Sequence, residues 1–208
     1  MSQNDTIQHP DPRFARVVAI IGLIACFVFV AGDIVGGIVV NDYDPIAETI
    51  SDLAAGQRSW ILDTAISIFA SSLLLSAVML YRWQLDENEL RWNIGCVVFL
   101  LLGLDILLIA NHDAYGDAVP TGVEIHIYLV YFLGFAFALV AWLFANGFGK
   151  ISKFWSRLSK GIGLVWLILA PIFFVVPTAW NGAYERFLGI IFLTWVASIY
   201  VFVLRHLR

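Results

Sequence analysis

Histidine and carboxylate side chains gather around one predicted hairpin of the chain. Asp105 lies inside an apolar stretch that ends just before His112 and Asp113, and His126 opens the next apolar stretch. Histidines and carboxylates can bind a divalent metal such as zinc, and they also serve as general acids and bases. These four residues are therefore candidate catalytic residues, and His112, Asp113 and His126 are candidate ligands of a zinc-like metal.

The spacing of these residues does not match a recognised catalytic motif. The sequence holds no His-Glu-x-x-His, Cys-x-x-Cys, phosphate loop or nucleophile elbow. Metal-dependent hydrolysis, acid–base chemistry without a metal, and passage of protons or cations along buried aspartates all stay open. A structural interpretation stands beside them, in which Arg186 neutralises acids and holds the helices in register. The members of that ion-pair network would be Asp33, Asp63, Glu48, Asp52, Glu185 and Arg186.

Composition decides the class of protein that positions these side chains. Of the 208 residues 61% are hydrophobic and only 13% are charged, and the mean hydropathy is +0.85. Such a chain is an integral membrane protein, with the lipid bilayer as its main partner and no role for nucleic acid. Six apolar segments are long enough to cross a hydrocarbon core of about 30 Å. They are Phe14–Val40, Trp60–Trp83, Trp92–Ala110, Val123–Asn146, Trp155–Pro177 and Phe187–Leu204. The predicted fold is thus an all-α, polytopic bundle of six transmembrane helices.

The basic residues predict how the bundle is oriented. Ten of the twelve Lys and Arg residues fall at the two ends of the chain or in the second and fourth loops, and only Arg58 and Arg186 fall elsewhere. The positive-inside rule then places both termini in the cytoplasm. Residues 1–208 form one membrane domain with a cytoplasmic tail at 1–12. The outward loops are 41–59, 111–122 and 178–186, and the cytoplasmic loops are 84–91 and 147–154.

The first outward loop predicts a short amphipathic helix on the outer face. Asp44 and Pro45 suit the N-cap and first position of a helix. Apolar residues then recur at helical spacing, and Gly56 ends the pattern. We expect this helix, over residues 44–55, to cover the bundle, with Glu48 and Asp52 reaching inward toward Arg186 or the histidines.

Three aspartates lie inside the predicted spans, all in the outward half. Asp33, Asp63 and Asp105 come from three different helices. An ionisable residue at membrane depth is costly and faces a partner or a wet cavity. A small-residue spacing, Gly32 and Gly36, surrounds the first of them and allows another helix to approach closely. The sequence therefore predicts a polar cavity open to the extracytoplasmic face.

Short motifs carry a resemblance to a known family. Tyr43-Asp44-Pro45-Ile46 and Ile50-Ser51-Asp52-Leu53 follow the first span, His126 opens the fourth, and Glu185-Arg186-x-Leu188-Gly189 opens the sixth. With these motifs the chain resembles the domain-of-unknown-function 998 family of six-helix membrane proteins. The resemblance implies the six-helix fold and a bacterial or archaeal cytoplasmic membrane, and it supplies no mechanism. The positions it carries over are Tyr43, Pro45, Ser51, Asp52, His126 and Arg186.

Three functions remain open from the sequence. The first is a small membrane enzyme that acts on a lipid-like substrate through the histidine and carboxylate cluster. The second is a transporter or ion-conducting protein that uses the membrane aspartates. The third is an accessory or assembly subunit, or a homo-oligomer, that binds a membrane-protein partner through exposed aromatic helix faces.

Overall fold

The computed structural model describes residues 11–111 and 120–206, with side chains in the fifth helix from residue 125 onward. Over these residues its regular secondary structure is entirely helical, with six helices long and apolar enough to cross a membrane. The predicted all-α, six-span fold is confirmed. The helices are α1 (Pro12–Val39), α2 (Ile50–Ala55), α3 (Trp60–Tyr81), α4 (Glu89–Asn111), α5 (Pro120–Ile151), α6 (Lys153–Leu169) and α7 (Asn181–His206). Two 3-10 helices, η1 (Ala170–Val175) and η2 (Thr178–Trp180), connect α6 to α7.

Helix boundaries differ from the predicted loops at two places. α5 continues to Ile151 and α6 begins at Lys153, so Ser152 alone separates them and the predicted loop 147–154 is mostly helical. The predicted outward loop 178–186 is likewise helical, because η2 and the first turns of α7 occupy it. Hydropathy detects only the part of a helix that lies in hydrocarbon, so it misses polar turns that extend beyond the bilayer.

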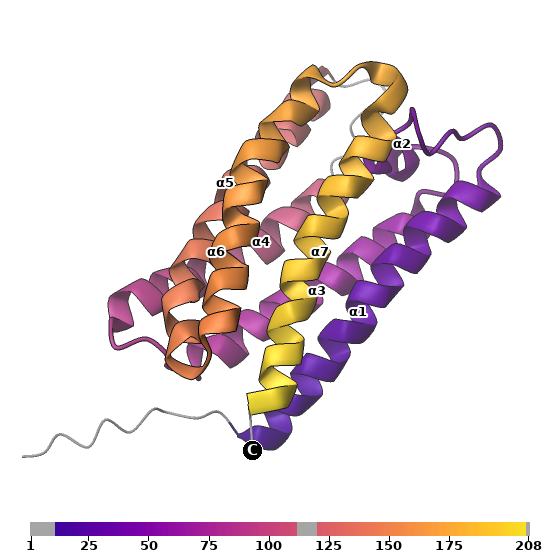
Figure 1. Cartoon of the computed structure of the whole chain (residues 1–208). Helices are drawn as coiled ribbons and strands as arrows, with labels where there is room; N and C mark the ends of the chain where they lie inside the picture. Colours follow the sequence, from indigo (N-terminus) through magenta and orange to yellow (C-terminus); the bar gives the residue numbers. More distant parts are fainter. Residues whose placement is uncertain (1–10, 112–119, 207–208) are drawn as a thin grey trace, which may run out of the picture.

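The long helices pack around a common core. α1 packs on α3 and α7, α4 lies between α3 and α5, and α6 packs on α5 and α7. The start of α1 and the end of α7 lie at one end of the bundle, whereas α2 and η2 lie at the other (Figure 1). We call the latter the α2 end. The basic residues predict that it faces the extracytoplasmic side.

Interlocked aromatic rings fill the core. The Trp195 ring centroid lies 5.3 Å from that of Phe137 and 5.8 Å from that of Phe99, both edge-on. The Trp195 indole N–H donates to Ser159 Oγ at 2.7 Å, and that hydroxyl donates to the Ala141 carbonyl at 2.7 Å. Since a buried indole N–H needs an acceptor, this chain of bonds lets the ring pack deeply without an unmet polar group.

Two glycines bring α1 close to its neighbours. A Cβ atom on Gly32 would lie 2.5 Å from Cβ of Ala65 in α3, and one on Gly36 would lie 3.0 Å from a methyl group of Leu53 in α2. No larger residue fits at Gly32 without moving α3. This close approach is the one that the spacing of the two glycines predicts, and it holds Asp33 near the segment that covers the bundle.

Candidate functional site

The segment 41–59, which we call the lid segment, contains a shorter helix than predicted. α2 begins at Ile50 with Thr49 as its N-cap, so the predicted start at Asp44 and Pro45 is wrong. Thr49 and Asp52 form a capping box: the Asp52 N–H donates to Thr49 Oγ1 at 2.9 Å, and the Thr49 N–H donates to Asp52 Oδ2 at 2.7 Å. The capping box satisfies two donors that the helix itself leaves unbonded, and it fixes where α2 begins. Gly56 is the C-cap, as expected.

The residues before Thr49 form a compact turn. The Glu48 N–H donates to the Asp44 carbonyl at 2.7 Å, and the Ile46 N–H donates to Asp44 Oδ1 at 2.9 Å. The turn directs the carbonyl groups of Pro45 and Glu48 toward α7, where Nη1 of the Arg186 side chain donates to both. These carbonyls are therefore unavailable to a helix that would start at Asp44, which explains the shorter α2.

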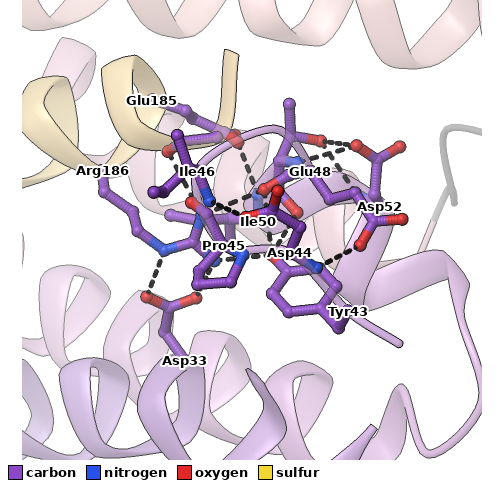
Figure 2. Close-up of polar contacts among 12 residues, drawn as sticks. Asp33, Tyr43, Asp44, Pro45, Ile46, Glu48, Ile50, Asp52, Glu185 and Arg186 are labelled. Carbon is purple, nitrogen blue, oxygen red and sulfur yellow. Dashed lines mark hydrogen bonds and ion pairs between the residues drawn. The ribbon is translucent and has the colours of Figure 1, made fainter. Parts of the chain in front are cut away.

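Arg186, in the second turn of α7, is the centre of the polar contacts at the α2 end (Figure 2). Its guanidinium binds Asp33 of α1 through two parallel hydrogen bonds, Nε to Oδ2 at 3.0 Å and Nη2 to Oδ1 at 2.8 Å. Nη2 also donates to the Tyr43 hydroxyl at 2.6 Å. We call Arg186, Asp33 and Tyr43 the arginine clamp. Bidentate pairing fixes orientation as well as charge, so the clamp joins α1, α7 and the lid segment in one geometry.

Backbone carbonyls complete the arginine clamp. Arg186 Nη1 donates to the carbonyls of Pro45 at 2.9 Å, Glu48 at 3.1 Å and Gly182 at 3.2 Å. Burial raises the pKa of Tyr43 to about 12, so its hydroxyl keeps its proton at neutral pH. That hydroxyl donates to the carbonyls of Thr49 at 2.8 Å and Glu48 at 3.1 Å. The lid segment is thus held to the bundle mainly through its own backbone.

The first turn of α7 also packs directly on the lid segment. The Gly182 N–H donates to the Ala47 carbonyl at 3.3 Å, and the Ala183 N–H donates to the Ile46 carbonyl at 2.9 Å. These are N–H groups at the start of a helix, which have no partner within the helix. A Cβ atom on Gly182 would lie only 2.0 Å from the Glu48 carbonyl oxygen. Only glycine permits this backbone contact.

The carboxylates of Glu48 and Asp52 bind backbone N–H groups of the lid segment itself, whereas the sequence suggested them as candidates to reach Arg186 or the histidines. Glu48 Oε2 accepts from the Asp44 N–H at 2.7 Å, and Asp52 caps α2. Both carboxylates bind the nearest unbonded backbone N–H groups of their own segment, a local competition that sequence spacing does not reveal. Glu48 contributes its carbonyl oxygen to the clamp instead of its carboxylate.

The other side of the lid segment carries a different set of contacts. Glu185 Oε2 accepts from the Ile50 N–H at 2.6 Å, which fixes the start of α2 beside α7. At the next residue, Ser51 Oγ lies 3.2 Å from Nε2 of the buried His126 in α5. A hydroxyl within hydrogen-bond reach of an imidazole is the arrangement of a nucleophile and its general base.

A cavity of about 800 Å³ opens beneath this serine–histidine pair. Its polar lining residues lie in the lid segment or at the starts of α5 and α7: Thr49, Ser51, His126, Asn181 and Glu185. Apolar side chains of α1, α3, α4, α5, α6, η1 and α7 form the remaining wall, including Phe29, Ile106, Trp166 and Phe192. The cavity is therefore apolar along most of its length and polar at the α2 end.

The predicted site residues fall in several places. His112 and Asp113 lie outside the residues that the structure describes. Asp105 is buried in α4, only 4% exposed, but the α4 residues that line the cavity are others: Ile106, Ile109 and Ala110. Asp63 lies partly buried in the first turn of α3. Of the two candidate catalytic residues that the structure describes, Asp105 and His126, His126 lines the cavity.

The zinc-like site stays a prediction. Two of its three ligands, His112 and Asp113, lie outside residues 11–111 and 120–206, and within those ranges no group of three or more His, Cys, Asp or Glu side chains could hold a metal ion. His126 Nε2 instead faces the Ser51 hydroxyl.

Residue spacing alone did not assign Ser51 or Asn181 to a candidate site. Ser51 stood in the motif that carries the family resemblance, but nothing in its spacing connects it with His126, which is 75 residues away. Asn181 has no sequence signal, because an asparagine near a predicted loop is ordinary. Both positions follow from the packing of the lid segment against α5 and α7.

The fold and the cavity define a polytopic α-helical membrane protein with an amphipathic internal cavity. The family model described as "Protein of unknown function (DUF998)" matches residues 23–201, so the chain belongs to this family and the resemblance seen in its motifs is confirmed. No curated protein and no solved structure matches the chain.

Proposed function

We propose that this protein binds a lipid-like ester in the cavity and hydrolyses or transfers its acyl group, with Ser51 as nucleophile and His126 as general base. The observation that carries the proposal is the 3.2 Å separation between Ser51 Oγ and His126 Nε2 at the polar end of an apolar cavity. A nucleophile next to a base is the minimal machinery for acyl transfer.

The shape and lining of the cavity support a lipid-like substrate. Its volume is within the usual range of small-molecule sites, about 300–1,000 Å³. Tyr131, Phe135 and Phe174 line it and are 51%, 67% and 45% exposed, so it opens toward the lipid-facing surface on this side. An acyl chain can therefore enter from the bilayer while its polar end reaches the lid segment.

The chemical step uses two atoms of this chain. Ser51 Oγ attacks the ester carbonyl carbon, and its proton passes to His126 Nε2, which requires the tautomer with the proton on Nδ1. The bond to the leaving alcohol breaks, and the alcohol takes that proton from His126. Water then attacks the acyl-serine ester with His126 again as base, which restores the Ser51 hydroxyl.

Glu185 is a positioning residue in this scheme. Its Oε2 accepts from the N–H of Ile50, the residue directly before Ser51. The contact fixes the start of α2 beside α7 and therefore sets where the Ser51 side chain points. A displacement of about 1 Å at a reacting atom can lower a rate by a factor of about 100.

Covalent labelling of the detergent-purified protein with a long-chain alkyl fluorophosphonate tests the proposal. We expect labelling of the wild type at Ser51, no labelling of Ser51→Ala, and labelling of His126→Gln slowed by a factor of about 100 or more, the usual contribution of a general base. Ser59→Ala, in the same lid segment, is the matched control and keeps the wild-type rate. A wild type that is not labelled, or a Ser51→Ala variant labelled like the wild type, would overturn the proposal.

The transport alternative has one supporting observation. Asp105 is buried in α4, and among the described residues its Oδ2 has no hydrogen-bond partner. This alternative expects Asp105→Asn to abolish proton or cation flux into liposomes while the protein stays folded. The accessory-subunit alternative stays a prediction, and co-purification of a stoichiometric membrane protein in mild detergent tests it.

A further inference from the structure

The described residues at the polar end of the cavity include an acidic side chain but no Lys or Arg. Among the described lining residues, Glu185 is acidic, His126 is titratable, and Thr49, Ser51 and Asn181 are neutral; none is Lys or Arg. A lipid head that reaches this end therefore meets an acidic side chain and, among the lining residues that the structure describes, no permanent cation.

The two basic residues near the α2 end are directed elsewhere. All three guanidinium nitrogens of Arg186 bind Asp33, Tyr43 or backbone carbonyls of the arginine clamp. Arg58 is exposed, and its Nη1 donates to the Val39 carbonyl at 3.3 Å. Neither residue lines the cavity. A phosphate group moved from water to this end would lose its hydration without gaining a cationic partner, which is costly.

The cavity wall instead offers hydrogen-bond acceptors. Asn181 Oδ1 is buried and has no hydrogen-bond partner among the described residues, and the carboxylate of Glu185 lines the same end. A buried acceptor without a donor is a cost that a ligand hydroxyl or amine can relieve. The complementary head group is therefore a donor of hydrogen bonds that carries no negative charge.

We infer that the ligand of this cavity is a single-chain lipid with an uncharged, hydroxyl-bearing head, such as a monoacylglycerol, and not a phosphate-bearing lipid. The inference rests on the proposed function, because it names the substrate class of the Ser51–His126 site. A glycerol hydroxyl can donate to Asn181 or Glu185 while the ester lies against Ser51, and the acyl chain fills the apolar part of the cavity.

Native mass spectrometry of the full chain in detergent tests this selectivity. The protein is titrated with an equimolar mixture of 1-oleoylglycerol and 1-oleoyl-lysophosphatidate, which differ only in the phosphate. We expect the monoacylglycerol adduct to exceed the lysophosphatidate adduct by about tenfold or more, because the phosphate would lose hydration there without gaining a cationic partner. Glu185→Gln keeps the shape and lowers the preference, and Asn181→Lys shifts it toward the phosphate-bearing lipid.

Cavity-filling variants show that binding occurs at this site. Gly134 lines the cavity, and a Cβ atom there would meet nothing within 4 Å, so Gly134→Phe fills the space and removes both adducts. Gly189→Phe repeats the test from α7, where the same holds. Gly161→Phe is the matched control, because Gly161 is equally open but does not line the cavity, and it keeps both adducts.

The outcomes separate this inference from the proposed function. Equal binding of the two lipids, or preference for lysophosphatidate, with both adducts lost in Gly134→Phe and Gly189→Phe, overturns the inference and leaves a lipid site in place. Adducts that neither cavity-filling variant removes overturn the inference and also the lipid cavity on which the proposed function depends. Fluorophosphonate labelling of Ser51 is independent of head-group preference.

Discussion

The two sides of the lid segment differ in how fully their polar groups are bonded. On the clamp side, both oxygens of Asp33 and all three nitrogens of Arg186 have partners between 2.6 and 3.2 Å. On the cavity side, Ser51 meets His126 at 3.2 Å, and Asn181 Oδ1 has no hydrogen-bond partner among the described residues, beside a space of about 800 Å³.

This difference shows how one short segment can place structural support on one side and a candidate site on the other. Arg186 and Glu185 are neighbours in α7, yet Arg186 binds the backbone and Asp33, whereas Glu185 faces the cavity. The arginine clamp fixes the lid segment, so the residues on its other face need not hold the fold together. A preorganised site needs such a support, because its own side chains must stay available for a substrate.

The largest effect is expected at the arginine clamp. Arg186→Met keeps much of the side-chain volume but leaves Asp33 without its partner and removes the donor to the lid carbonyls. The two side chains are only 20% and 15% exposed, so the loss should approach the cost of breaking a buried ion pair by removing one partner, about 3–5 kcal/mol. We expect a loss of this size in the free energy of unfolding, measured by denaturant titration in detergent.

Arg58→Met is the control for the clamp, because Arg58 is exposed and makes one long contact, to the Val39 carbonyl. Its cost should be within about 0.5 kcal/mol, as for most surface substitutions. The double variant Asp33→Asn with Arg186→Met measures the coupling between the two side chains. If the two single losses simply add, the clamp does not join α1 to α7 and the comparison above fails.

A smaller loss is expected where α7 contacts the lid backbone. In Gly182→Ala the new methyl group collides with the Glu48 carbonyl, so the lid segment or α7 must move. Overpacking of this kind costs about 1–3 kcal/mol. The displaced Ser51 should also react more slowly with the fluorophosphonate. Gly161→Ala, at an open position, should be neutral or slightly stabilising. Equal stabilities and equal labelling rates of the two variants would contradict the contact.

The sequence predicted the fold and one half of this site. Apolar length was enough for six spans, since hydrocarbon thickness leaves few alternatives. The acids and Arg186 at the α2 end were also expected, but as one cluster. The division into a clamp and a cavity depends on the turn at Asp44, on the backbone contact at Gly182 and on which neighbour each carboxylate binds. Those features depend on tertiary contacts, which the spacing of residues along one helix does not reveal.

The pair Arg91–Asp86, at the connection between α3 and α4, offers a reference for the clamp with the same bidentate geometry, at 2.7 and 2.8 Å. Asp86 is nearly buried but the Arg91 side chain is 35% exposed, so solvent screening reduces the value of the pair. Asp86→Asn should therefore cost about 1 kcal/mol at neutral pH, clearly less than Arg186→Met. A loss as large as that of the clamp variant would remove the distinction between the two pairs.

The pH dependence of the Asp86 pair has a definite sign. Burial opposes ionisation, but the hydrogen bonds from Arg91 and the Asn88 N–H outweigh it, so the pKa of Asp86 lies below its ordinary value of 3.8. The stability it contributes is present above about pH 4 and is lost as the pH falls through the lowered folded-state pKa. The melting temperatures of the wild type and of Asp86→Asn should thus differ by a constant amount near neutral pH and converge in acid. If the two melting temperatures diverged in acid, the pKa of Asp86 would be raised in the folded state and not lowered.

The smallest effect on stability is expected for Ser51→Ala. This variant tests most directly whether the two sides of the lid segment have different roles. Ser51→Ala removes one hydroxyl contact to His126 while the capping box, the clamp and the Gly182 contact stay intact. The loss in the free energy of unfolding should be about 1 kcal/mol or less, although labelling by the fluorophosphonate should disappear. A loss of stability that matches Gly182→Ala would instead make the serine–histidine pair part of the support. If stability is kept and reactivity is lost, the pair contributes to chemistry and not to the fold.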